Sequence, residues 1–122
     1  MSDVRPELDP REWVFCSIDP ASDLDLDPVA TFAEDEGLTV VIERRQARAL
    51  GLDERFPSRR ITLLVYSDLN AVGFLAPIAT ALAKRGIAVN TFSAVHHDHL
   101  FVPIDRADEA MRVILAISST VR

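Results

Sequence analysis

The fold is decided by residues 60–104, RITLLVYSDLNAVGFLAPIATALAKRGIAVNTFSAVHHDHLFVPI. Residues 61–66 are apolar at nearly every position, which is typical of a strand that is covered on both faces. Apolar residues then recur at helical spacing at Leu75, Ile78, Ala79 and Leu82, before Gly86 ends the helix. The pattern predicts strand, turn, helix, strand, turn and strand, with the polar residues gathered at the two turns.

The rest of the second half extends this series. Residues 87–95 and 100–104 alternate in the manner of strands, and Pro103, which cannot donate to a ladder, is expected at a strand end or facing away from a partner. Asp105 is the predicted cap of a last helix. Its apolar stripe consists of Ala107, Ala110, Met111, Ile114 and Ile117. The order β-α-β-β-α predicts an α+β, ferredoxin-like unit.

The first half is shorter. Residues 1–12 predict an extended or poorly ordered arm, and strands are expected at 13–18, 29–33 and 38–43. A short helix over 44–50 should end at Gly51, and 53–58 should form a linker. We therefore expect an abbreviated β-β-β-α half over 13–58 and the full unit over 59–118. The second apolar face of strand 61–66, with Leu64 and Tyr66, requires cover from the first half or from a second chain.

Composition and charge restrict the class of function. The chain has 122 residues, a net charge of −6 and a pI of about 4.9, which argues against nucleic acid as a partner. No apolar run is long enough for a membrane span, and no signal peptide is expected at the N-terminus. The single cysteine, Cys16, lies between apolar neighbours and is expected to be buried. Together these features favour the cytoplasm.

The ordered series of motifs resembles the ACT domain family, and in particular small stand-alone proteins in which an abbreviated ACT-like half precedes a full ACT unit. The matching pieces are WVFC (13–16), ATF (30–32), EGLT (36–39), SDLNAVG (67–73), KRGI (84–87) and HDHLFVP (97–103). The resemblance implies a regulatory domain that binds an amino acid or a similar metabolite. It also implies a ligand at the first strand–helix turn, usually across an interface between two ACT units, and therefore a homodimer.

The turn at 67–73 has features of its own that favour an anionic group. The first amides of a helix lack intrahelical partners and point, with the positive end of the helix dipole, toward whatever lies above them. Ser67 or Asp68 is the expected N-cap, and Gly73 permits close approach of the backbone. Pro77 predicts either a helix that begins near Phe74 or a kink. The candidate ligand-binding residues are Ser67, Asp68, Leu69, Asn70, Ala71, Val72, Gly73, Phe74, Leu75, Asn90, His97, Asp98 and His99.

All three histidines of the chain, His96, His97 and His99, lie in the second turn with Asp98. Imidazole and carboxylate suit zinc, but only His97 and His99 would share a face, so no metal or other cofactor is expected. The preferred role of this turn is a polar contact to a ligand. Catalytic motifs are missing from the sequence, so we expect a non-enzymatic protein. Two alternatives remain open: an interaction or oligomerisation module without a small ligand, and a metal-binding protein or metal-dependent enzyme that uses the histidine cluster.

Overall fold

The computed structural model describes residues 4–66 and 68–120. The chain divides into two compact units, which we call the small unit (residues 11–58) and the large unit (the remaining described residues). Strands β1 (Pro6–Ile18) and β4 (Arg55–Leu63) each contribute residues to both units. Each unit has its own cluster of buried apolar side chains, so each is described by itself.

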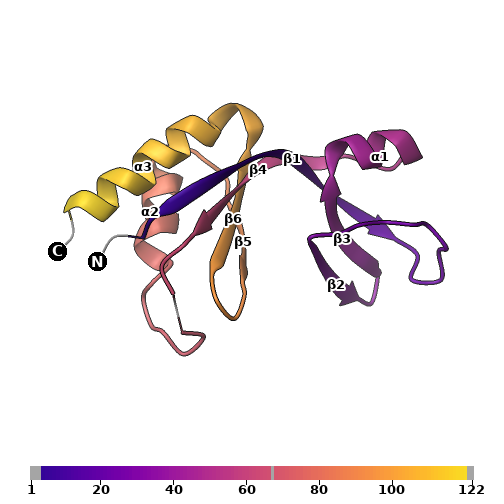
Figure 1. Ribbon diagram of the computed structural model, residues 1–122, viewed down its shortest axis with the longest axis horizontal. Helices are drawn as coiled ribbons and strands as arrows, with labels where there is room; N and C mark the ends of the chain where they lie inside the picture. The colour runs from indigo at the N-terminus through magenta and orange to yellow at the C-terminus, as the bar shows by residue number, and fades with distance from the viewer. Residues whose placement is uncertain (1–3, 67, 121–122) are drawn as a thin grey trace. The chain divides into compact units, whose positions relative to one another are not determined.

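The small unit is an antiparallel sheet with one short helix. Strands β2 (Ala30–Glu34) and β3 (Gly37–Glu43) form a hairpin, and β3 also pairs with β1 in the order β2-β3-β1 (Figure 1). Helix α1 (Arg44–Leu50) ends at Gly51, whose φ of 68° lies in the left-handed region, as the sequence predicts. The core consists of Val14, Cys16, Val40, Ile42 and Ala47.

The large unit has the predicted ferredoxin-like order. Strands β5 (Asn90–Ser93) and β6 (Asp98–Pro103) form a hairpin, and the sheet order is β1-β4-β6-β5. Helices α2 (Ala76–Lys84) and α3 (Ala107–Thr120) contact each other, and a 3-10 turn, η1 (Ile104–Arg106), precedes α3 (Figure 1). Apolar side chains from strands and helices meet in one core, which includes Ile61, Leu63, Leu82, Leu100, Val102 and Ile114.

Two predictions about chain ends and linkers are wrong. Strand β1 begins at Pro6, so most of the expected arm is strand, and β4 begins at Arg55, so the expected linker is largely strand as well. The charged residues hid the strand pattern in the sequence, because charges of opposite sign on the two strands pair with each other. The Arg60 Nη2 lies 2.7 Å from an Asp9 carboxylate oxygen. Both side chains are mostly buried, and the pair satisfies charges that would otherwise be costly there.

The predicted strand over 61–66 also differs from the structure. Strand β4 ends at Leu63, although the Leu64 amide still donates to the Arg5 carbonyl at 3.0 Å. Within this single chain Tyr66 is 62% exposed and Leu64 is half-buried, and cover of this face by a second chain stays a prediction. The apolar run therefore passes from a buried strand into an exposed connection.

Several helix and strand ends differ from expectation. Helix α2 begins at Ala76 with Leu75 as N-cap and no capping side chain, so Asp68 is not the cap, and Ser67 lies outside the described residues. Pro77 occupies the first turn, where its missing N–H is tolerated. Asp105 lies inside η1 and does not cap α3, and β5 covers only part of 87–95. Pro103 ends β6, as predicted.

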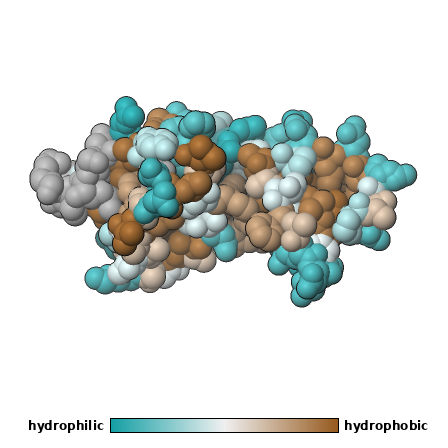
Figure 2. All heavy atoms as spheres, turned by 90° about the horizontal axis from the view of Figure 1, so that it is seen from below, coloured by the Kyte–Doolittle hydropathy of each residue, from teal (hydrophilic) through white to brown (hydrophobic). Residues whose placement is uncertain are grey.

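On the face seen in Figure 2, hydrophilic and hydrophobic residues are mixed. Within residues 4–66 and 68–120, no helix is both long and apolar enough to cross a membrane. Cys16 is buried, as expected, and its Sγ donates to the Asp53 carbonyl at 3.0 Å.

Candidate functional site

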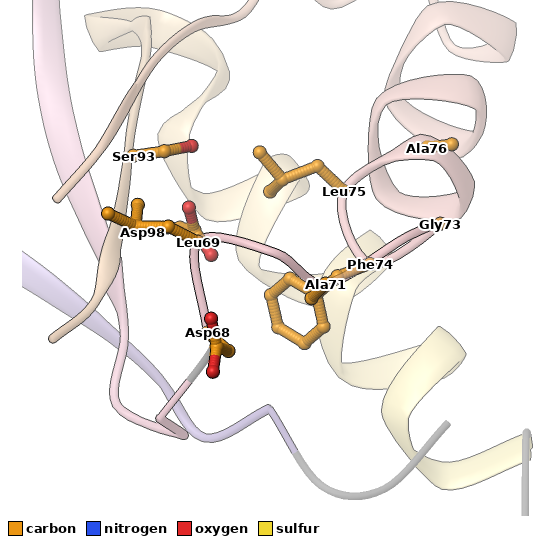
Figure 3. A pocket seen from close by; sticks show the side chains of 9 residues that line it. All are labelled: Asp68, Leu69, Ala71, Gly73, Phe74, Leu75, Ala76, Ser93 and Asp98. Atoms are coloured by element: carbon orange, nitrogen blue, oxygen red, sulfur yellow. The ribbon is translucent and has the colours of Figure 1, made fainter. Parts of the chain in front are cut away.

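A cavity of about 240 Å³ lies in the large unit, between the segment that leads into α2 and the β5–β6 hairpin (Figure 3). The segment contributes seven of the lining residues: Asp68, Leu69, Ala71, Gly73, Phe74, Leu75 and Ala76. The hairpin contributes Ser93 and Asp98. Two larger surface hollows exist, and the lining of each includes an ion pair, Arg85–Glu109 in one and Arg45–Glu43 in the other.

Local hydrogen bonds shape the segment between β4 and α2. The Asp68 Oδ1 accepts the Asn70 amide at 2.9 Å, and the Asp68 carbonyl accepts the Ala71 amide at 2.9 Å, which is an Asx-type turn. Gly73 has a φ of 78°, which an L side chain rarely adopts. Space for a Cβ at Gly73 is open, so the glycine is required by the backbone conformation and it leaves room at the cavity.

Two residues at the start of α2 that line the cavity have backbone amides without a hydrogen bond to the described residues. Leu75 is the N-cap and Ala76 the first helical residue, and the first helical bond is donated by Ala79 to the Leu75 carbonyl at 2.9 Å. The amides of Leu75 and Ala76 precede this bond and make no hydrogen bond to any described residue. They can therefore bind an anionic group that enters the cavity.

Asp98 is the buried charge of this site. In β6 it lies on the same face as Leu100 and Val102, which are in the core, because side chains alternate along a strand. The residue is only 5% exposed, and its carboxylate has no hydrogen bond or ion pair to the part of the chain that the structure describes. Its oxygens are not among the buried side-chain atoms without a partner in the described residues, so they reach the cavity, where a cationic ligand group would contact them.

The structure brings together part of the predicted ligand-binding set. Seven of its residues line the cavity: Asp68, Leu69, Ala71, Gly73, Phe74, Leu75 and Asp98. The side chains of Asn70, Val72, Asn90, His97 and His99 do not line it, and Ser67 lies outside the described residues. Asn90 is at the opposite end of β5 from Ser93, which explains why it does not reach the cavity.

Sequence reasoning missed Ser93 and Ala76. Ser93 is the cross-strand partner of Asp98 in the β5–β6 hairpin. Its position could have been found from the hairpin register once Asp98 was chosen, because directly opposed residues project from the same face. Ala76 carries no polar side chain, and its contribution to the site is its backbone amide at the helix start.

None of the three histidines lines the cavity. The His99 Nδ1 lies 2.9 Å from the Thr62 hydroxyl, and the strand alternation places it on the face opposite Asp98. Burial, followed by the nearby charges of Arg60 and His97, lowers the pKa of His99. His97 has a buried Nδ1 that lacks a hydrogen-bond partner among the described residues. Within the described ranges no three His, Cys, Asp or Glu side chains form a potential metal site.

Four exposed large apolar side chains belong to the two segments that form the cavity. Tyr66, Leu69 and Val72 precede α2, and Val95 is in the β5–β6 turn. Val72 is 98% exposed, which is unusual for a large apolar side chain. We call these four residues the apolar rim.

Comparison with known structures gives one close relative and several distant ones. A Vibrio cholerae protein of unknown function, described as a possible transport protein, is 41% identical over 93% of this chain and 88% of its own, with a TM-score of 0.85. A structural genomics target from Agobacterium tumefaciens is 12% identical, with a TM-score of 0.81, over 97% of this chain and 91% of that one. No curated protein matches the sequence.

The fold is also shared with two aspartate kinase structures. The aspartokinase alpha and beta subunits match with 12% identity and a TM-score of 0.63, over 89% of this chain and 93% of that one. A putative C-terminal regulatory domain of aspartate kinase from Porphyromonas gingivalis matches with 13% identity and a TM-score of 0.55, over 92% and 96%. Two models described as ACT domain match residues 1–59 and 56–116. The chain therefore belongs to the ACT domain family, with two ACT-type domains in tandem.

Proposed function

We propose that this protein is a non-catalytic regulatory or sensor protein that binds an amino acid in the cavity at the start of α2. The observation that carries the proposal is Asp98, a buried carboxylate that lines the cavity and has no partner among the described residues. A carboxylate that lines a cavity without a partner is available to a cationic ligand group, and a charged hydrogen bond to it is among the stronger contacts in proteins.

The two halves of an amino acid match the two ends of the cavity. The ligand's ammonium group contacts Asp98, and its carboxylate accepts hydrogen bonds from the amides of Leu75 and Ala76. Gly73 leaves the space through which the carboxylate approaches the helix start. In Figure 3, Ser93 and Asp98 stand on one side of the view and Leu75 and Ala76 on the other.

The family supports a regulatory role, because ACT domains are typically regulatory and bind small ligands. We extend the proposal to a cytoplasmic homodimer, in line with the oligomers that ACT domains commonly form. We also propose that residues 13–58 serve as an abbreviated half and 59–118 as the ligand-binding ACT domain.

Titration calorimetry with a panel of amino acids tests the proposal. The wild-type protein should bind at least one of them, and Asp98→Asn should weaken that binding at least about tenfold, because a charged hydrogen bond is replaced by a neutral one. Asp35→Asn, in the turn between β2 and β3, is the control for net charge and should bind as the wild type does. Failure of every amino acid to bind at millimolar concentration would contradict the proposal.

A second candidate function is an interaction module without a small ligand. The apolar rim favours it, because large apolar side chains at this exposure are typical of surfaces that bind another protein. Sedimentation of the wild type and of Val72→Ser separates the two candidates. A stable oligomer that Val72→Ser disrupts, together with an empty calorimetric screen, would favour the interaction module.

A further inference from the structure

The charges around the cavity do not balance, and this imbalance bears on the class of ligand. Two carboxylates, Asp68 and Asp98, are among the lining residues, and no Lys, Arg or His side chain is found among the described lining residues. We infer that the preferred ligand is a cationic amino acid, one that carries a second positive group on its side chain. This inference rests on the proposed function and deepens it.

A neutral amino acid leaves one of the two carboxylates without a cation. Its ammonium group satisfies Asp98, and its carboxylate is satisfied by the amides of Leu75 and Ala76. These three contacts use both charges of the zwitterion. Asp68 then remains at the cavity as an unbalanced negative charge, in a protein whose net charge is already −6.

Asp68 is positioned to receive a second cationic group. Its Oδ1 is occupied by the Asn70 amide at 2.9 Å, which fixes the carboxylate as part of the turn. Its other oxygen has no hydrogen bond or ion pair to any described residue. The residue is exposed, whereas Asp98 is buried, so a ligand that contacts both extends from the interior of the cavity to its opening.

The remaining lining suits the aliphatic part of such a ligand. Leu69, Phe74 and Leu75 supply apolar surface at the cavity (Figure 3). A side chain of several methylene groups packs against this surface while its charged end stays near solvent, as lysine side chains do in proteins. A ligand with a second carboxylate would instead place like charges together and bind poorly.

Lysine and norleucine are the probes that test this inference, because norleucine keeps the same number of side-chain carbons and lacks the ε-ammonium group. Calorimetry at low salt should show lysine binding at least about fivefold more tightly than norleucine to the wild type. In Asp68→Asn the advantage should fall below about twofold, while the asparagine Oδ1 still accepts the turn hydrogen bond. Asp35→Asn, with the same change in net charge, should retain the full advantage.

Salt provides an independent readout. Raising the ionic strength should reduce the preference for lysine in the wild type and have little effect in Asp68→Asn, because the Asp68 contact is exposed and screened. Equal affinity for the two probes in the wild type, or tighter binding of glutamate, would overturn the inference and leave amino-acid binding intact. If neither probe nor any other amino acid binds, the proposed function itself fails and the inference fails with it.

Discussion

Ser93 and Asp98 are directly opposed across the β5–β6 hairpin, and both line the cavity at the start of α2. The Ser93 hydroxyl and the Asp98 carboxylate therefore lie on the same side of the cavity. Both residues belong to strands of the sheet, β5 and β6. Because a rigid element holds the polar groups, a ligand finds them already positioned.

Asp98→Asn should stabilise the ligand-free protein. The substitution removes a buried charge that has no partner among the described residues and keeps the side-chain size, so the free energy of unfolding should rise by about 1 kcal/mol. Urea denaturation at pH 7 measures this change. Asp68→Asn is the exposed control and should stay within about 0.5 kcal/mol of the wild type. A clear loss of stability in Asp98→Asn would mean that the carboxylate has a stabilising partner.

Gly73→Val should abolish ligand binding, because the new side chain would occupy the space beside the helix start. The φ of 78° adds backbone strain, so stability should also fall by roughly 1–2 kcal/mol, less than a core truncation costs. Gly86→Val is the matched control, since Gly86 has a φ of 68°, an equally open Cβ position and no place in the cavity lining. Calorimetry and urea denaturation of both variants should show similar losses of stability and a loss of binding in Gly73→Val alone.

His99 should make stability depend on pH in the weakly acidic range. Its pKa is lowered in the folded protein from the ordinary value of 6.5, so the unfolded chain binds a proton more readily than the folded one. The contribution of neutral His99 to the free energy of unfolding is therefore fully present above pH 6.5. It is lost as the pH falls below that value toward the lower pKa of the folded state. Denaturation between pH 7.5 and 5.5 should show a smaller loss in His99→Gln than in the wild type. An identical slope in the two proteins would exclude His99 as the cause.

Cys16 should be unreactive in the folded protein. It is 2% exposed, and burial, with the negative charge of Asp53 as the next cause, raises the pKa of its thiol, so little thiolate is present at neutral pH. A disulfide reagent such as Ellman's reagent should label the native protein slowly and the urea-unfolded protein at once. Because the chain has one cysteine, the signal has a single source. Fast labelling without denaturant would show that the small unit opens readily.

Zinc should not bind stoichiometrically to the purified, untagged protein. His99 is paired with Thr62, and strand alternation places Asp98 on the opposite face of β6. Elemental analysis measures the metal content directly. One tightly held metal per chain that is lost in His97→Ala would contradict this prediction and show that the histidine turn binds metal.

Much of the site could be predicted from the sequence because its main features are local. Gly73 and Pro77 mark the conformation of the segment before α2, and the backbone amides follow from where the helix begins. Asn90 does not line the cavity, because its distance from the cavity depends on how far β5 runs before the turn, and strand length is set by pairing with β6. The position of Ser93 at the cavity likewise follows only from the pairing register of β5 with β6.

What the sequence by itself determined is the order of elements, the family and the turns, because hydrophobic period and glycine conformations are properties of the local chain. What only the tertiary structure decided is which charges are buried and which strands they join. Asp9 and Arg60 are 51 positions apart and form an ion pair between the neighbouring strands β1 and β4. The segments that the sequence predicts as an arm and a linker are largely part of these strands. Asp98 is buried whereas Asp68 is exposed, and the burial of Asp98 depends on the core that Leu100, Val102 and the two helices form.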